Sequence, residues 1–352
     1  MKIFVTILSI LVLLASIIPF LKSNKWFVRV FDYPRFQKLV LVTICLILWF
    51  VFINEHEILD WILLGLLSIN FVYLVKVVLP YTPIGKKMID QVELNQDEKP
   101  LNLLVYNVYQ DNDEYQKLVK LIQKKNPAIL FLLETDLVWM EKIREATDEY
   151  PYKIEVPLDN TYGLLFYSKL PIKNQEVNYL ISEEIPSIIA DIEYNNQIIR
   201  LYGLHPTPPV PQENEESTER DAEILIVGKL ASEYKKPAIV FGDLNDVAWS
   251  KTTELFLKTS HMLDARRGRG MYNTFHTKYW FLRWPLDHYF LSSQFRLIDM
   301  TREDNIGSDH YPISLSVVLR SDDTSGEIYL DKEEKEEVKE KIVEGVEKGD
   351  AN

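Results

Sequence analysis

The sequence has almost no cysteine: Cys45 is the single one among 352 residues, and it lies inside an apolar run. One cysteine excludes a disulfide framework and a metal site built from thiolates, and it leaves the redox compartment open. Positive charge is also scarce, because 39 Lys and Arg residues stand against 52 Asp and Glu residues. The net charge of -13 argues against broad, charge-driven binding of nucleic acid.

Long apolar runs, by contrast, dominate the N-terminal part of the chain. They lie at about residues 3–21, 39–54 and 58–80. The first run carries no charge and is long enough to cross a bilayer core, and the third has Asp60 and Lys76 only near its ends. The alternative for the first run is a cleaved signal peptide, but no small-x-small cleavage site follows it closely and two more apolar runs come after. We therefore predict that residues 1–80 form three transmembrane helices of an integral protein of the cell membrane, in contact with the lipid bilayer.

Two rules predict opposite orientations for this protein in the membrane. The loop over residues 22–38 carries five cations and one anion, and Lys86 and Lys87 follow the third run. The positive-inside rule then places everything after the third helix in the cytoplasm. A chain that starts Met-Lys-Ile before an apolar run more often inserts with its N-terminus inside, which places the C-terminal domain outside. The side of the membrane stays open.

The rest of the chain divides into three parts. Residues 81–99 are polar and are predicted to form a linker. Residues 100–320 mix many strands with few helices, which predicts sheets packed face to face with helices outside, an α+β layered domain. The clearest strands are LNLLVYNV (101–108), AILFLLET (128–135), GLLFYSKLPI (163–172) and AIVF (238–241), and helices are expected at 217–233 and near 252–259. Residues 321–352 form an acidic tail that is expected to be a solvated helix or disordered.

The most informative stretch is Pro237-Ala-Ile-Val-Phe-Gly-Asp-Leu-Asn245. A short buried strand breaks at Gly242 and presents Asp243 and Asn245, which point the same way because they are two residues apart. A carboxylate and an amide on a rigid strand end suit a divalent cation and a phosphate oxygen. The alternative is an ordinary turn rich in Asp and Asn.

Other predicted strands also begin or end in polar residues with no evident packing role. These residues are Asn107, Glu134, His205, Asp287, Asp309 and His310. Each alone could be a cap or turn residue. Functional groups collect where strands meet loops, so their shared placement favours a site.

The series YNV, LLET, GLHP, GDLN, PLDH and SDH resembles the endonuclease/exonuclease/phosphatase superfamily, which is DNase I-like, over about residues 101–320. The strand GLLFYSKLPI fits the same pattern. The resemblance implies a four-layered α/β/β/α sandwich and an enzyme, a Mg²⁺-dependent phosphoesterase.

The resemblance also implies a role for each polar residue. Glu134 resembles the principal metal ligand, with Asn107 beside it and Asp309 on the metal side. Asp243 and Asn245 contact the attacking water or the phosphate. His310 resembles the histidine that assists at phosphorus, Asp287 holds its ring, and His205 matches a second histidine of the DNase-like and sphingomyelinase-like members.

The chemistry of these groups agrees with that assignment. A phosphodiester is anionic, so attack on it needs charge neutralisation by a cation and by hydrogen-bond donors. A carboxylate that fixes one histidine nitrogen determines what the other nitrogen presents to the substrate. Oxygen ligands without cysteine suit Mg²⁺ or Mn²⁺ better than zinc.

Several other polar residues are predicted to have no catalytic role. His288 follows Asp287 directly and faces the other way on a strand, so it is expected to be structural. His56, His261 and His276 have no partner spacing and are interpreted in the same way. Arg220 could hold the Pro-rich loop at 206–211, but we expect it to be a surface charge.

Two loops bear on the substrate. The rigid loop 205–211 leads into the acidic run 213–219, which would repel DNA phosphates. The stretch 266–284 mixes arginines with aromatics, either packed on the core or forming a rim that contacts lipid. A tether shorter than about twenty residues would keep the site close to the bilayer.

These features predict a membrane-anchored phosphoesterase. Its substrate would be a lipid-linked or membrane-proximal phosphodiester, phosphomonoester or pyrophosphate. The alternatives are a membrane-tethered nuclease, which the acidity disfavours, and an inactive binding scaffold, which would gain nothing from a complete set of polar groups.

Overall fold

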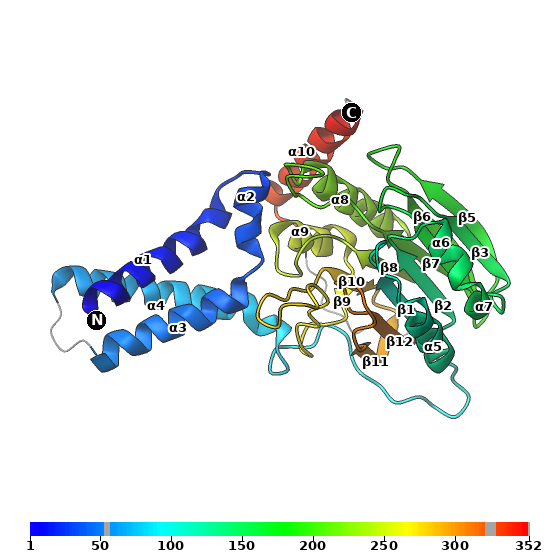
Figure 1. Cartoon of the computed structure of the whole chain (residues 1–352), viewed down its shortest axis with the longest axis horizontal. Coiled ribbons are helices and arrows are strands. Elements are labelled where there is room, and N and C mark those ends of the chain that lie inside the picture. The colour runs from blue at the N-terminus through cyan, green and yellow to red at the C-terminus, as the bar shows by residue number, and fades with distance from the viewer. Residues whose placement is uncertain (53–56, 321–328, 351–352) are drawn as a thin grey trace.

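The computed structural model describes residues 1–52, 57–320 and 329–350. Three parts of the predictions lie outside the described residues: the end of the expected second apolar helix, His56 and the first part of the acidic tail. The described chain has two parts, a narrow helical bundle at the left of Figure 1 and a broad two-sheet domain at the right.

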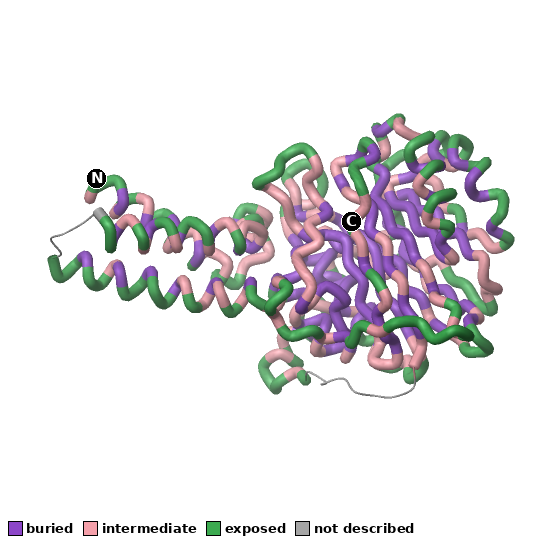
Figure 2. Tube along the Cα trace, turned by 90° about the horizontal axis from the view of Figure 1, so that it is seen from below, coloured by how far each residue is buried: buried purple, intermediate pink, exposed green. Residues whose placement is uncertain are grey.

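The bundle is built from the apolar runs. Its elements are α1 (Lys2–Ile17), η1 (Ile18–Phe20), α2 (Trp26–Arg29), η2 (Val30–Asp32), α3 (Arg35–Phe52), α4 (Ile58–Val78) and η3 (Leu79–Tyr81). Most large apolar side chains of the bundle are exposed, whereas those of the domain are buried (Figure 2). Polar groups inside the bundle pair across helices: the Trp49 indole donates to Ser9 at 3.0 Å, and Asn70 donates to Ser16 at 3.1 Å. Such pairing is typical of helices that associate in lipid.

Two of these helical stretches, Lys2–Phe20 and Ile58–Tyr81, are each long and apolar enough to cross a membrane. The third expected span is a pair of helices, Trp26–Asp32 and Arg35–Val51, bent by 66° at the break between them. Within the described residues, length and composition therefore give two spans, or three if the bent pair counts as one, where the sequence predicted three.

The domain holds two six-stranded sheets, with strand orders β11-β12-β1-β2-β4-β3 and β5-β6-β7-β8-β10-β9. The first sheet comprises β1 (Leu101–Asn107), β2 (Ile129–Leu133), β3 (Tyr152–Val156), β4 (Leu164–Ser168), β11 (Phe295–Arg302) and β12 (Ile313–Leu319). The second comprises β5 (Ile172–Asn178), β6 (Ser187–Tyr194), β7 (Gln197–Leu204), β8 (Ala238–Asp243), β9 (Leu263–Asp264) and β10 (Asp287–Leu291). The sheets share one apolar core, in which the rings of Phe131 and Phe241 lie 5.2 Å apart.

Helices cover both outer faces of this sandwich. α5 (Tyr115–Lys125), α6 (Leu137–Lys142) and α7 (Arg144–Thr147) lie on the first sheet, with Leu118, Ile122 and Trp139 buried against it. α8 (Thr218–Glu233) and α9 (Lys251–Ser260) lie on the second sheet. The predicted α+β sandwich of two sheets with helices outside is confirmed.

The acidic tail contains α10 (Lys332–Gly349), which begins in a capping box formed by Asp331 and Glu334. It packs along α8, seen in red at the top of Figure 1. Val338 is buried, and Gly345 lies so close to Ala222 that a Cβ on it would come within 2.1 Å of the Ala222 methyl. Residues 332–349 therefore form a helix, one of the two expected forms, and a few small and apolar residues give it a face that packs on α8.

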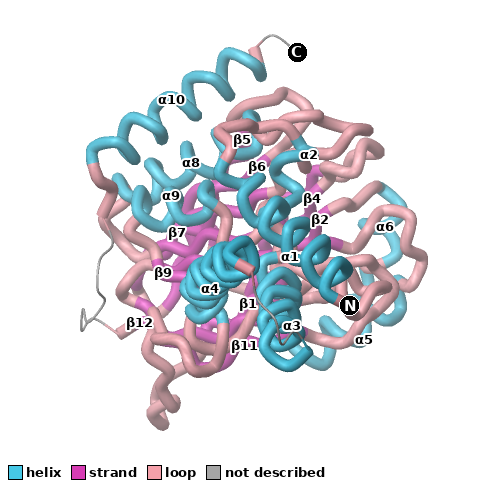
Figure 3. The backbone as a smooth tube through the Cα atoms, turned by 90° about the vertical axis from the view of Figure 1, so that its left-hand side faces the viewer, coloured by secondary structure: helices cyan, strands magenta, loops and turns pink. Residues whose placement is uncertain are grey.

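Residues 81–99 lie against the domain rather than spanning open solvent. Ile89 enters the core between the sheets. The Val92 amide donates to the Leu297 carbonyl at 2.9 Å, and the Leu297 amide donates to the Asp90 carbonyl at 3.0 Å. The bundle is thus joined to the domain by a docked segment, and Figure 3 shows α1, α3 and α4 in front of the domain.

Candidate active site

The strand register brings the predicted polar residues to one edge of the two sheets. β1 and β2 are parallel, with Asn107 beside Leu133, so Glu134 follows next to Asn107. β7 and β8 are also parallel, with Leu204 beside Gly242, and β10 runs antiparallel with Asp287 beside Asp243. Carboxyl ends of parallel strands meet at the same edge, which explains why residues far apart in the chain converge here.

The turn after β8 needs the glycine that precedes it. Gly242 has φ +136°, and a Cβ there would lie 2.0 Å from the Leu204 carbonyl oxygen. Asn245 has φ +50°; its amide donates to Asp243 Oδ1 at 2.9 Å and its side chain donates to the Pro206 carbonyl at 3.0 Å. A functional site and an ordinary Asp-rich turn, the two interpretations of residues 237–245, are therefore compatible. Asp243 Oδ1 closes the turn, and Asp243 Oδ2 faces the site.

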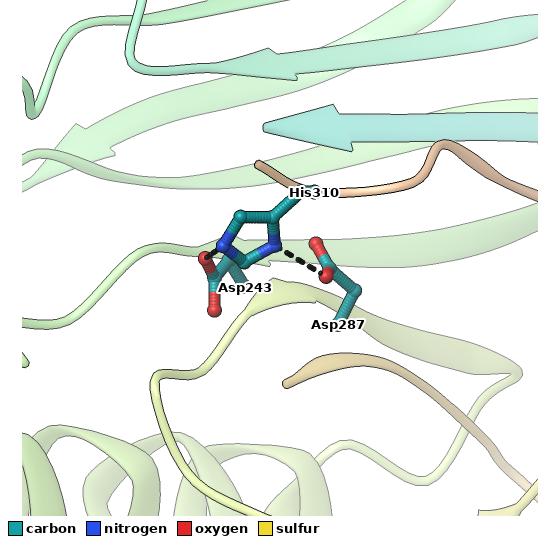
Figure 4. A group of neighbouring side chains, drawn as sticks. All are labelled: Asp243, Asp287 and His310. Atoms are coloured by element: carbon teal, nitrogen blue, oxygen red, sulfur yellow. Dashed lines mark hydrogen bonds and ion pairs between the residues drawn. The ribbon is translucent and has the colours of Figure 1, made fainter. Parts of the chain in front are cut away.

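His310 lies between two carboxylates, as Figure 4 shows. Its Nδ1 lies 2.8 Å from Asp287 Oδ2, and its Nε2 lies 3.4 Å from Asp243 Oδ2. Burial alone would lower the pKa of His310, but Asp243 and Asp287 outweigh it and raise that pKa to about 10. The imidazole is therefore a cation at neutral pH, with both N–H groups donating.

Hydroxyl groups fix this histidine and its partner. The Asp287 amide donates to Thr274 Oγ1 at 3.2 Å, and the His310 amide donates to Ser308 Oγ at 2.9 Å. Ser308 Oγ in turn donates to the Asn107 carbonyl at 2.9 Å. His310 lies just before β12 of the first sheet, so its bond to Asp287 on β10 joins the two sheets.

Glu134 is a carboxylate that the fold places in a desolvated position. It has φ +57°, and its Oε1 accepts a 2.6 Å hydrogen bond from Asn107 Nδ2, which also donates to Asp243 Oδ2 at 3.1 Å. Burial, followed by the charges of Asp309 and Asp243, raises the pKa of Glu134 to about 7, against the opposing effects of Asn107 and His310. Asp309 is half-buried, and its Oδ1 lies 3.3 Å from Ser308 Oγ.

His205 faces the same acidic group. Its Nε2 lies 4.0 Å from both Glu134 Oε1 and Asp243 Oδ2. Burial lowers its pKa to about 4, so the ring is neutral at physiological pH. The Tyr162 ring lies 5.5 Å from it and covers one side.

The residues at this edge fit a hard divalent cation. Ligand atoms of Asp243, Asp287 and His310 lie within 4.8 Å of one another, but there the protonated ring already compensates the carboxylates. Within residues 1–52, 57–320 and 329–350, neither Glu134 nor Asp309 forms an ion pair with Lys or Arg. Carboxylate oxygens without a cationic partner are donors that Mg²⁺ and similar ions take.

Two residues near the site were missed or misjudged from the sequence. Arg220, predicted to be a surface charge, is 1% exposed; it donates to the Asn245 carbonyl at 2.6 Å and to Asp221 at 2.8 Å. It holds the turn after β8, not the Pro-rich loop. Tyr33 also reaches that carbonyl, at 3.0 Å. Only the tertiary fold reveals these contacts, because no local spacing connects residues 33, 220 and 245.

The remaining histidines in the described residues are outside the group. His288 is buried and its Nε2 lies 2.9 Å from the Asp246 carbonyl, which agrees with a structural role. His261 ends α9 with φ +57°, and His276 accepts from the Lys278 amide at 3.1 Å in a surface loop.

Such a two-sheet sandwich, with an Asp–His pair and uncompensated oxygen ligands at one edge, defines a class of metal-dependent phosphoester hydrolases. The model of the Endonuclease/Exonuclease/phosphatase family matches residues 104–310, and the chain belongs to this family. It is therefore a metal-dependent hydrolase that acts on phosphoester bonds.

Solved structures show the same fold. Humanized D. rerio TDP2 with 14 mutations aligns with a TM-score of 0.52 at 16% identity, over 62% of this chain and 99% of that one. D. rerio TDP2 complexed with single strand DNA product gives 0.51 at 17% identity, over 63% and 100%. The endonuclease/exonuclease/phosphatase from Bacteroides vulgatus gives 0.51 at 16% identity, over 63% and 100%. Comparison with curated proteins gives no match.

Proposed function

We propose that this protein is a membrane-anchored, Mg²⁺-dependent phosphoesterase that hydrolyses a phosphodiester, phosphomonoester or pyrophosphate in a lipid-linked or membrane-proximal substrate; Mn²⁺ would serve as an alternative cation. The observation that carries the proposal is one loop, residues 274–284. It contacts the site at one end and the helical bundle at its tip.

At the site, this loop is bonded to the strand end that carries the catalytic histidine. The Thr277 amide donates to the Asp309 carbonyl at 2.9 Å, and Thr277 Oγ1 donates to the Ser308 carbonyl at 2.8 Å. At the tip, Gln37 on the first turn of α3 donates to the Phe281 carbonyl at 2.8 Å. The loop therefore links the site to the place where the apolar helices meet the domain.

The tip of the loop exposes aromatic side chains. Trp280 is 80% exposed, Phe281 52% and Tyr279 44%. Aromatic residues of this kind concentrate at membrane–water interfaces, where an apolar ring and a polar group are both accommodated. The geometry supports a substrate that is presented at the membrane surface.

The proposed chemistry assigns the metal to Glu134, with Asn107 and Asp309 beside it. A divalent cation bound there would neutralise phosphate charge and lower the pKa of a bound water. Asp243 accepts the proton of the attacking water, and His310, oriented by Asp287, donates to the phosphoryl oxygens as their charge grows. Asn245 and the neutral His205 supply further hydrogen bonds to the phosphate.

A membrane-tethered nuclease is the second candidate, and the fold shared with a DNA-bound TDP2 favours it. An acidic hollow beside the site opposes it. The lining of this cavity of about 590 Å³ includes Tyr162, Thr207, five glutamates (Glu184, Glu213, Glu215, Glu216 and Glu219) and Lys348, which pairs with Glu216 at 3.0 Å. Because Tyr162 also covers His205, a polyanionic strand entering from this side would meet strong repulsion.

The test uses the full chain in detergent with Mg²⁺ and offers three substrates in parallel: a DNA oligonucleotide, a phospholipid and a polyprenyl pyrophosphate. Glu134→Gln is the inactivating variant, and Glu155→Gln, on β3 and exposed, is the matched control. Turnover of a lipid substrate that is lost only in Glu134→Gln supports the proposal. DNA cleavage with that pattern identifies a nuclease, and no turnover of any substrate favours the scaffold.

A further inference from the structure

The segment between α1 and α3 is docked on the catalytic domain beside the site. The Trp26 amide donates to the Glu215 carbonyl at 2.8 Å, and the Ser217 amide donates to the Asn24 carbonyl at 2.8 Å. The Trp249 indole donates to the Asp32 carbonyl at 2.8 Å. Figure 1 shows α2 next to the end of α8. A segment held by backbone hydrogen bonds of this kind is part of the domain structure and not a free loop.

One side chain of this segment reaches the turn that carries Asp243 and Asn245. Tyr33 donates its hydroxyl to the Asn245 carbonyl at 3.0 Å, and Arg220 donates to the same oxygen at 2.6 Å. Two donors use both lone pairs of this carbonyl. Asn245 has φ +50°, a conformation that persists in a non-glycine residue only where the surroundings enforce it.

The segment also contacts this turn indirectly, through the buried carboxylate of Asp221. Asp221 is fully buried and accepts from Arg220 at 2.8 Å, from Arg29 at 3.2 Å and from Lys341 on α10 at 2.9 Å. Arg220 also lies 3.4 Å from Asp246, at the end of the same turn. Buried charges keep their geometry only while their partners are present. The orientation of the Arg220 guanidinium therefore depends on Asp221 and on the other two cations that Asp221 binds.

We propose that residues 26–33 belong to the catalytic apparatus, with Tyr33 and Arg29 as positioning residues that fix the Asp243–Asn245 turn. The inference rests on the proposed function, because it assigns the turn a role in catalysis. The membrane-proximal segment then does more than tether the enzyme: it completes the support of the residues that contact water and phosphate. A fragment that begins after the bundle would lack this support.

The test compares Tyr33→Phe with Tyr150→Phe in the full chain in detergent. Both variants lose a hydroxyl that donates to a backbone carbonyl, and Tyr150 donates to Pro127 at 2.9 Å, on a helix-covered face away from the site. The probe substrate is bis(p-nitrophenyl) phosphate with saturating Mg²⁺. We expect Tyr33→Phe to lower kcat about tenfold with KM nearly unchanged, as expected for losing one hydrogen bond that orients the site. Tyr150→Phe should keep the wild-type kcat.

Hydrogen–deuterium exchange of the peptide covering residues 243–250 gives a readout that needs no turnover. It should be faster in Tyr33→Phe and unchanged in Tyr150→Phe. A kcat for Tyr33→Phe equal to that of the wild type overturns the inference. If the wild type hydrolyses no phosphoester, the proposed function fails, and exchange decides this inference alone: unchanged protection of 243–250 overturns it.

Discussion

Replacing Asp287 by Asn tests the Asp–His pair without changing its shape. Asp287 Oδ2 lies 2.8 Å from His310 Nδ1, and the Asp287 backbone is held by Thr274, so an isosteric amide keeps its place. The substitution removes the negative charge that stabilises the imidazolium. A charge-assisted hydrogen bond contributes about twice as much as a neutral one.

The expected loss of kcat arises because the His310 imidazolium is less stable just when negative charge develops on the phosphate. We expect kcat to fall about 10²- to 10³-fold, which corresponds to about 3–4 kcal/mol, with KM within about threefold of wild type. The assay is hydrolysis of bis(p-nitrophenyl) phosphate by the full chain with saturating Mg²⁺. Asp191→Asn is the control, because Asp191 also forms an ion pair, with Arg200 at 2.7 Å, on a strand of the same sheet.

The control should lose stability and keep its kcat. An Asp287→Asn variant with more than half of the wild-type kcat would refute the role of the pair. An equal loss in Asp191→Asn would show that the effect reflects general destabilisation of the sheet.

Three further predictions concern stability. Burial raises the pKa of Glu223 from 4.5 to about 8, so the folded state holds the proton more tightly, and its stability should fall as pH rises from 4.5 to 8. Glu223→Gln should therefore raise Tm at pH 8.5 and leave it nearly unchanged at pH 4.5 in thermal melts; a pH-independent difference would contradict the burial argument. Gly242→Ala would place a methyl 2.0 Å from the Leu204 carbonyl oxygen, and we expect a loss of about 3 kcal/mol or more, seen as insoluble or unfolded protein by circular dichroism. Lys341→Met removes one of the cations on buried Asp221 and should cost about 1–3 kcal/mol in chemical denaturation, whereas Lys339→Met, on the exposed side of α10, should cost almost nothing.

The polar residues of the site could be predicted from the sequence because each one lies directly beside a run of residues that marks a strand. Apolar runs that end in Asn107, Glu134, His205 and Asp243 mark strands whose ends carry polar groups, and parallel pairing brings such ends together. The family resemblance added the four-layered sandwich of two sheets with helices outside. Fold class and enzyme class followed from these two signals.

What the sequence did not reveal depends on contacts between distant segments. Arg220 is hydrophilic and lies on a helix, so only its buried partners Asp221 and Asp246 explain its position inside the protein. The docking of residues 22–34 uses two backbone hydrogen bonds and side chains such as Arg29 and Tyr33, whose partners lie about 190 residues or more away in the chain. α10 packs through Val338 and Gly345, too few residues to outweigh its acidic composition in a composition-based prediction.

The most direct test of the central claim is the initial rate of phosphate-ester hydrolysis in detergent mixed micelles that contain a phospholipid at increasing mole fraction. The full chain is assayed with Mg²⁺, with a chelator, and as Glu134→Gln. We predict a rate that rises with the surface fraction of lipid and vanishes with the chelator and in the variant. A rate that is unchanged in Glu134→Gln would contradict the assignment of the site, and faster cleavage of a DNA oligonucleotide under the same conditions would contradict the membrane-proximal substrate.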